Sequence, residues 1–216
     1  MQADEIKNKV GKPIKDIYGR YMGFIAGYSV DGSGKLIAVG IDEGQGQFSE
    51  YLGTRLVLAE EGPAMLPAWK VDTEGLGQNG ATIRKRLEAL KGLAKEGEVP
   101  PHIYEEMTNE YSTQLKSLDD SYAQLSQTVA KRVRELDADI ESIDRFLVNI
   151  KVQHRSGEVD EQTFKSVSDN CGGMKARNLQ EKEELVRLVK SISELVAPRI
   201  TVTVPPSREK AAATTN

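Results

Sequence analysis

The sequence contains very few of the residues that catalytic and metal-binding proteins commonly use. Among its 216 residues there are one cysteine and two histidines. The single Cys171 cannot form an intrachain disulfide, so we expect a reducing compartment. His102 and His154 fall at opposite ends of a long predicted helix, so they cannot share a metal ion. We therefore expect no catalytic residue, no cofactor and no metal, although an enzyme with an unrecognised carboxylate or lysine site remains an alternative.

The chain also lacks long apolar runs and a strong excess of charge of one sign. No segment approaches the roughly 18 apolar residues that a membrane span requires. The charged start MQADEIKNKVGK does not resemble a signal peptide. A formal net charge of −4 provides no overall basic field that would attract nucleic acid. These absences together predict a cytoplasmic protein.

Glycine is concentrated in the first of three regions with different composition. Thirteen of the 19 glycines lie in residues 1–79. There, short alternating runs such as RYMGFIAGYSV and KLIAVGID are separated by glycine-rich turns, which is typical of a small antiparallel β-barrel or sandwich. Trp69, in LPAWKV at the end of this region, is predicted to be a core or barrel-closing residue, with a surface anchor for a partner or lipid as the alternative.

Residues 80–197 are predicted to be helical, with helices at about 81–96, 102–154 and 160–196. Gly-Glu-Val recurs at Gly97 and Gly157, where each glycine ends one helix before the next begins. Both sites are predicted to be corners of helical hairpins. The middle helix would be about 80 Å long, which predicts an extended rather than compact shape.

A heptad repeat of apolar residues predicts that this region is a coiled coil. In the middle helix the seam contains Tyr111, Leu115, Leu118, Tyr122, Leu125 and Val129, and after one stutter Val133, Leu136, Ile140, Ile143, Leu147 and Ile150. In the last helix it contains Phe164, Val167, Cys171, Met174, Leu185, Leu188, Ile192 and Leu195, with Asn178 and Glu181 at two intervening positions.

A pair of glycines and several clusters of basic residues in the helices support two further predictions. Gly172 and Gly173 interrupt the last helix, where each glycine costs about 1 kcal/mol, so we expect a kink, a flexible joint or a close helix approach. Basic clusters such as Lys131, Arg132 and Arg134 are expected to lie on a solvated helix face, with contact to nucleic acid or anionic lipid as the alternative.

Residues 198–216 are predicted to be a flexible tail that contains one strand, 199–204. A lone strand cannot satisfy its own backbone hydrogen bonds, so we expect it to add to the sheet edge of a partner. Its isoleucine and valines would enter pockets of that partner. A frayed tail without function is the alternative. The predicted partner-binding residues are Arg199, Ile200, Thr201, Val202, Thr203, Val204 and Pro205.

The start of the chain resembles a PRC-barrel domain. The residues that carry this resemblance are Gly11, Lys12, Ile14, Asp16, Gly19, Met22, Gly23 and Ile25. The whole arrangement, a barrel followed by a long coiled coil and a detached strand, resembles the archaeal CdvA family of cell-division proteins. The fold class expected is thus α+β: a small N-terminal antiparallel β-barrel, an extended antiparallel helical coiled coil and a C-terminal tail strand.

This resemblance implies a non-enzymatic scaffold that forms filaments and marks the mid-cell division site. It implies a homodimer or homopolymer formed through the coiled coil, and recruitment of the ESCRT-III-like protein CdvB by the terminal strand. Association with a membrane surface and with DNA or the nucleoid is also implied. The alternative is a PRC-barrel adaptor in RNA or ribosome maturation. Residues 1–79 carry 8 basic and 11 acidic side chains, a net charge of −3, which disfavours that alternative.

Overall fold

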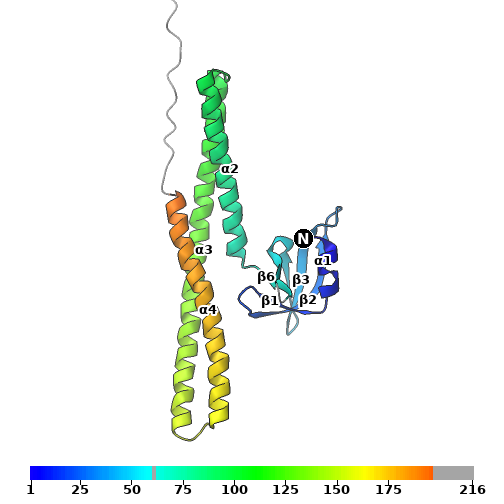
Figure 1. Ribbon diagram of the computed structural model, residues 1–216, viewed down its shortest axis with the longest axis vertical. Helices are drawn as coiled ribbons and strands as arrows, with labels where there is room; N and C mark the ends of the chain where they lie inside the picture. The colour runs from blue at the N-terminus through cyan, green and yellow to red at the C-terminus, as the bar shows by residue number, and fades with distance from the viewer. Residues whose placement is uncertain (60–61, 197–216) are drawn as a thin grey trace, which may run out of the picture.

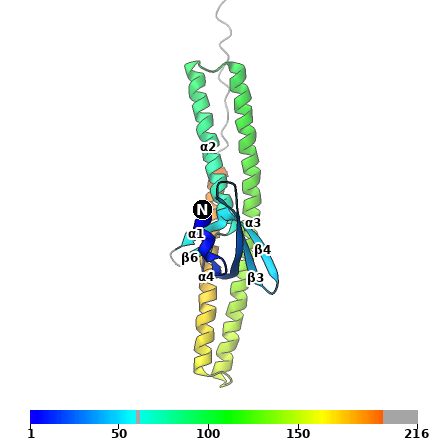
Figure 2. The ribbon, with the colours of Figure 1, turned by 90° about the vertical axis from the view of Figure 1, so that its right-hand side faces the viewer.

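The protein consists of a small β domain that lies beside the middle of a long helical arm (Figure 1). The computed structural model describes residues 1–59 and 62–196. We call residues 1–67 the β domain, and α2, α3 and α4 together the helical arm. Figure 2, turned by 90°, again shows the β domain against the middle of the arm. The two hairpin corners therefore project away from the β domain in opposite directions.

The β domain is one six-stranded sheet with short helical segments at its edges. Neighbouring strands pair in the order β4-β3-β2-β1-β6-β5. The pairs are antiparallel except for β1 and β6, which run parallel. Its elements are α1 (Ala3–Ile6), η1 (Lys7–Lys9), β1 (Pro13–Asp16), β2 (Tyr21–Val30), β3 (Leu36–Gly44), β4 (Gln47–Leu52), η2 (Gly53–Arg55), β5 (Leu56–Ala59) and β6 (Gly62–Met65).

The predicted closed antiparallel barrel is therefore wrong in two respects, because the sheet is mixed and open. After β4 the chain passes through η2 and forms the hairpin β5–β6, which joins the sheet through the parallel pair β1–β6. In the described residues β4 and β5 are then the two edges and do not pair with each other. Strand alternation predicts which residues form strands, but it does not determine the direction in which the last hairpin returns.

The core of the β domain is built from β-branched and other apolar side chains that pack together. Ile6 from α1 is a fully buried member of this core. The other buried members are Ile14, Ile25, Leu36, Val39, Ile41, Leu56 and Met65. Gly23 allows β2 to approach β3 closely, since a Cβ at this position would fall on the carbonyl oxygen of Asp42.

The first helix of the arm, α2 (Ala68–Glu96), begins well before its predicted start at residue 81. Pro67 stands at its N-cap, where the missing N–H of proline costs nothing and its fixed φ angle suits the entry into a helix. Glycines and Asn79 between residues 75 and 80 have poor helix propensity, so this part of the helix could not be predicted from the sequence. Packing of this segment against α3 stabilises the helix despite its low helix propensity.

The central helix of the arm, α3 (Pro101–Arg155), is one uninterrupted helix of 55 residues. The helix α2 packs antiparallel on its first half and α4 (Glu161–Val196) packs antiparallel on its second half (Figure 1). Gly97 has a φ of 77° and Gly157 a φ of 81°, as helix-ending glycines require. Both glycines lie at hairpin corners, as predicted.

The buried seam of α3 agrees with the heptad pattern, whereas the seam of α4 agrees only in part. Val129 and Leu136 of α3 and Leu185 of α4 are fully buried. Met174, predicted at the seam of α4, is 49% exposed. The helix continues through Gly172 and Gly173, and a Cβ on Gly172 would meet no atom within 4 Å. The glycines therefore mark no close helix approach.

The corner between α3 and α4 is closed by side chains from both helices. The ring of His154 stacks on Phe164 at 4.5 Å, and its Nε2 lies 3.1 Å from a carboxylate oxygen of Glu161. Asp160 caps α4 by accepting a hydrogen bond of 2.8 Å from the backbone N–H of Thr163. These contacts place His154 at the end of α3, where the sequence predicts it.

Candidate docking site between the β domain and the helical arm

A short loop after β1 projects two side chains from the β domain toward α4. The Asp16 carboxylate accepts hydrogen bonds from the backbone N–H groups of Tyr18 and Arg20, at 2.9 and 2.8 Å. It also accepts one from Nε of Arg20 at 2.6 Å. Gly19 has a φ of 84°, which few other residues tolerate. Asp16 and Gly19 thus hold Tyr18 and Arg20 in fixed positions.

Glu181 of α4 is the centre of the contact between the two parts. It is only 2% exposed, although it is a carboxylate on a helix surface. Nη2 of Arg20 lies 2.6 Å from Oε2 of Glu181. Arg132 of α3 donates to both carboxylate oxygens, at 3.1 Å from Nε and 2.9 Å from Nη2. Three parts of the chain, the β1–β2 loop, α3 and α4, therefore converge on one buried charge.

The two arginines keep Glu181 ionised despite its burial. Burial by itself raises the pKa of Glu181, but the hydrogen bonds and positive charges of Arg132 and Arg20 outweigh it, and the pKa is lowered overall. The hydrogen bonds to Glu181 in turn raise the pKa of Arg132. Arg20 also donates to Oδ1 of Asn178 at 3.3 Å. Removal of an arginine would therefore leave the buried charge of Glu181 without an opposite charge to balance it.

A second group of contacts is centred on Glu184, one turn further along α4. The Tyr18 hydroxyl donates to the Glu184 carboxylate at 3.1 Å, and Nζ of Lys70 lies 2.9 Å from the same oxygen. Burial and the nearby Glu184 charge raise the pKa of Tyr18 well above its usual range. Tyr18 therefore stays protonated and remains a hydrogen-bond donor.

Trp69 supplies the apolar part of this docking site. It lies in the first turn of α2 and is 9% exposed. It belongs to the buried cluster of the helical arm together with Tyr18, Leu125, Val129 and Leu185. Trp69 is thus a core residue, as predicted, but it does not close the β domain. Because α2 begins earlier than expected, the side chain packs against α3 and α4 instead.

An open cleft of about 540 Å³ borders the docking site and is lined by charged side chains of both signs. Arg20, Arg55, Lys131 and Arg132 contribute positive charge, while Asp16, Glu135 and Glu181 contribute negative charge. The lining contains no histidine, cysteine or serine. No group of side chains suited to a metal ion occurs in residues 1–59 and 62–196.

Sequence reasoning did not identify this docking site. The predicted partner-binding segment, Arg199–Pro205, lies outside the described residues. Arg132 was expected to be solvated, yet it pairs with Glu181. A signal was present in the sequence: Asn178 and Glu181 occupy seam positions where apolar residues are the rule. Buried polar residues at a seam require partners, and these partners come from a distant part of the chain.

The fold and the docking site define the class of this protein. It is an elongated coiled-coil protein whose β domain is docked on the helical arm by buried ion pairs. Within the described parts of the chain, none of the helices is sufficiently long and apolar to span a bilayer.

Comparison with known proteins places the chain in a family. The profile of the CdvA-like coiled-coil domain matches residues 68–214, so the chain belongs to the CdvA-like family. Cell division protein A of Sulfolobus acidocaldarius is 28% identical over 158 residues, which cover 73% of this chain and 66% of the relative. The match therefore spans slightly less than two thirds of that relative. No solved structure matches this chain. The CdvA-like family is not a known family of enzymes.

Proposed function

We propose that this protein is a non-enzymatic scaffold of archaeal cell division. In this proposal it assembles through its helical arm, marks the division site in the cytoplasm, and recruits an ESCRT-III-like protein through its C-terminal segment. The observation that carries the proposal is the extent of the family match, which runs from Ala68 at the start of the arm to residue 214 in the terminal segment. The relative's name, a cell division protein, supports the biological setting.

Apolar side chains outside the α3–α4 seam support assembly through the arm. Val148 and Val152, one turn apart on α3, are 63% and 60% exposed. Val186 on α4 is 53% exposed. A hairpin of two helices covers one stripe on each helix, so further apolar positions gain from contact with another helix. A second copy of the chain is the partner in this proposal.

Recruitment rests on the sequence of the terminal segment. Ile200, Val202 and Val204 alternate with threonine, which suits the addition of a strand to an exposed sheet edge. Backbone hydrogen bonds would supply affinity, and the three apolar side chains would supply specificity. Pro205 and Pro206 lack N–H donors and would limit further strand pairing.

Association of the assembly with a membrane surface and with DNA is part of the same proposal. The net charge of −3 in residues 1–79 means that such binding would depend on local lysine clusters and on salt. Flotation with anionic vesicles and retention on duplex DNA at 50 and at about 300 mM salt would measure both associations.

Self-association is tested by sedimentation of the full chain at micromolar concentration. We expect dimers or larger species whose fraction rises with concentration, because helix–helix contacts between copies obey mass action. A monomer that persists up to about 100 µM would contradict assembly through the arm.

Recruitment is tested with a peptide covering residues 197–216 and the same peptide with Val202→Asp. We expect the first peptide alone to retain an ESCRT-III-like protein from archaeal lysate, identified by mass spectrometry. A buried aspartate costs several kcal/mol in an apolar slot, so the second peptide should retain little. Equal retention by both peptides would argue against strand addition.

A further inference from the structure

We propose that the docking site also works between copies, so that the β domain of one molecule docks on the helical arm of another. This inference rests on the proposed function as a self-assembling scaffold and specifies a contact through which copies are joined. Such an exchange reuses an interface that the chain already forms with itself, so no new complementary surface is needed.

Residues 1–70 form the unit that would be exchanged. Its anchors are Tyr18, Arg20, Trp69 and Lys70, which converge on the same region of the arm. Trp69 and Lys70 lie in the first turn of α2, so this turn would move together with the β domain. A buried aromatic residue surrounded by charge pairs is the usual composition of a strong interface centre.

The receiving surface belongs entirely to α3 and α4. Glu181 and Glu184 of α4 accept the polar contacts, and Arg132 of α3 holds Glu181 from the other side. The apolar wall is formed by residues of the same two helices, among them Leu125 and Leu185. The donor unit and the receiving surface are therefore separate parts of the chain, connected only through the rest of α2.

The connection between them is the weakest part of α2. Gly75, Gly77 and Gly80 fall within residues 71–80, and each glycine in a helix costs about 1 kcal/mol relative to alanine. A Cβ at Gly75 or at Gly77 would meet no atom within 4 Å, so packing does not require glycine at either position. This segment is thus suited to unwind. Unwinding lengthens ten residues from about 15 Å to about 33 Å.

The geometry of exchange also determines the kind of assembly. Two molecules that exchange units reciprocally form a closed dimer. A molecule that passes its unit to a neighbour while receiving one from another neighbour makes a heterologous contact. Heterologous contacts that do not close produce an open chain, which is the form of a filament.

The test uses two full-length variants that cannot dock their own β domain. The first carries Arg20→Glu, which spoils its donor unit and leaves its arm intact. The second carries Glu181→Gln and Glu184→Gln, which spoil its arm and leave its donor unit intact. In a mixture, only the β domain of the second variant and the arm of the first can form the native contacts.

Energy transfer between dyes reports this contact and not mere association. In a Cys171→Ser background, the arm of the first variant is labelled at Gly172→Cys and the β domain of the second at Gly32→Cys. Both glycines are exposed, and a Cβ on either would meet no atom within 4 Å. The control mixture adds Arg20→Glu to the second variant. Circular dichroism verifies that every variant remains folded.

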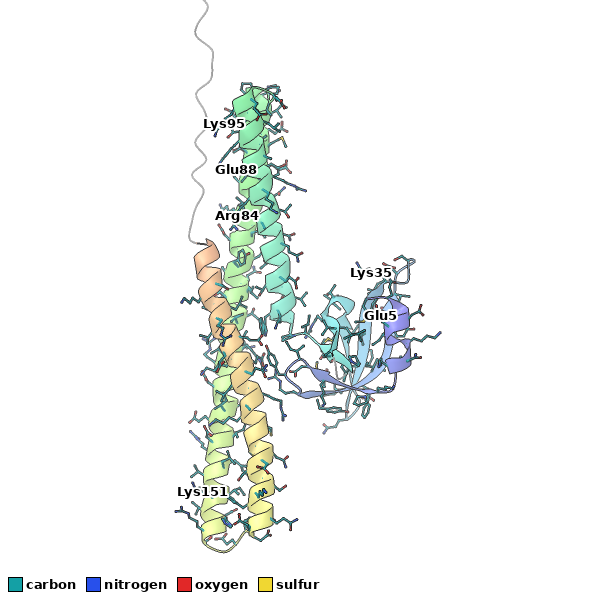
Figure 3. The ribbon with its side chains drawn as sticks, viewed as in Figure 1. Glu5, Lys35, Arg84, Glu88, Lys95 and Lys151 are labelled. Carbon is teal, nitrogen blue, oxygen red and sulfur yellow. The ribbon has the colours of Figure 1, made fainter. Side chains whose placement is uncertain are left out.

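We expect the docked fraction in the complementary mixture to exceed that of the control mixture at least about tenfold, because a removed partner leaves a buried charge uncompensated. Lys35→Glu, a charge reversal on the side of the β domain away from the arm (Figure 3), should not reduce transfer. Equal transfer in the complementary and control mixtures would overturn the exchange. If the wild-type protein nevertheless forms dimers or larger species in sedimentation, the scaffold proposal is unaffected. A wild type that stays monomeric in sedimentation contradicts the scaffold proposal instead.

The hinge is tested within the same mixture. Gly75→Ala with Gly77→Ala in the second variant should slow the appearance of transfer several-fold, since both changes strengthen the helix that must unwind. Gly92→Ala, in the same helix and also without neighbours within 4 Å, should leave that rate unchanged. A rate that the double change does not alter would overturn this position of the hinge.

Discussion

Replacement of Glu181 by alanine should destabilise the protein far more than the loss of an ordinary surface carboxylate. Glu181 is 2% exposed and receives hydrogen bonds or ion pairs from both Arg20 and Arg132. Breaking a buried ion pair by removing one partner typically costs 3–5 kcal/mol, because the remaining charge is uncompensated.

The cost of losing Glu181 should be smaller than this typical value, because Arg20 and Arg132 are partly exposed. The side chains of Arg20 and Arg132 are 25% and 34% exposed, so water can solvate part of each charge after the carboxylate is lost. Arg20 also retains its contact with Asp16, at 2.6 Å. We therefore expect a loss of about 2–3 kcal/mol in the free energy of unfolding, below the usual range for a fully enclosed pair.

The assay is equilibrium unfolding in urea, which does not screen ion pairs as a guanidinium salt would. Glu183→Ala is the matched control, since Glu183 lies on the same helix and pairs with Arg187 at 3.4 Å with both side chains largely exposed. That change should cost less than about 0.5 kcal/mol. Equal effects of the two substitutions would refute the reasoning that the buried ion pairs at Glu181 hold the β domain on the arm.

Three further predictions follow from glycine geometry and from charge. Gly75→Ala and Gly77→Ala should each stabilise α2 by about 0.5–1 kcal/mol and raise helicity measured by circular dichroism, whereas unchanged helicity would contradict the weak-helix interpretation. Gly23→Ala should destabilise the β domain by more than about 2 kcal/mol, because φ is 131° and the new Cβ meets backbone, while Gly27→Ala, with open space, should cost much less in the same urea assay. Docking of the β domain should weaken in acid. Because the pKa of Glu181 is lowered from the ordinary value of 4.5, the ionised carboxylate stabilises docking above pH 4.5, and this stabilisation is lost as the pH falls below 4.5 and the carboxylate is protonated. Energy transfer within one doubly labelled molecule between pH 7 and pH 3 would follow this loss, and an unchanged signal would contradict it.

The helical arm is the part of the fold that the sequence predicts best, and the reason is physical. The side chains of a long helix repeat with a fixed period, so Leu125, Val129 and Leu136 are placed on one face without knowledge of their partner. Glycine at 97 and at 157 ends each helix by local backbone preference. These features depend on near neighbours in the sequence.

The features that sequence reasoning missed depend on distant parts of the chain. The first turns of α2 contain Gly75, Gly77 and Gly80 and are helical because the arm packs against them, which overrides local propensity. The open sheet follows from the parallel pairing of β1 with β6, a choice that alternation within a strand does not encode.

The docking site was visible only as an anomaly. Glu181 and Asn178 at seam positions indicate that something polar must meet them, but nothing nearby in the sequence identifies Arg20 as the partner. The position of Arg20 depends on the turn that Asp16 and Gly19 create, and on how the whole sheet lies against the arm. A heptad with polar exceptions is therefore a useful sign that a second domain docks there.

The uninterrupted course of α3 has one more consequence. Among the elements that the structure describes, α3 alone belongs to both hairpins. Its length therefore sets the distance between the two hairpins and their relative rotation about the helix axis. Each residue in a helix turns the chain by about 100°, because 3.6 residues make one turn. One residue inserted near the middle of α3 would turn the α4 hairpin away from the β domain by that angle, whereas a change of seven residues would nearly restore the alignment. The length of α3 is thus under an angular constraint that its apolar pattern alone does not reveal.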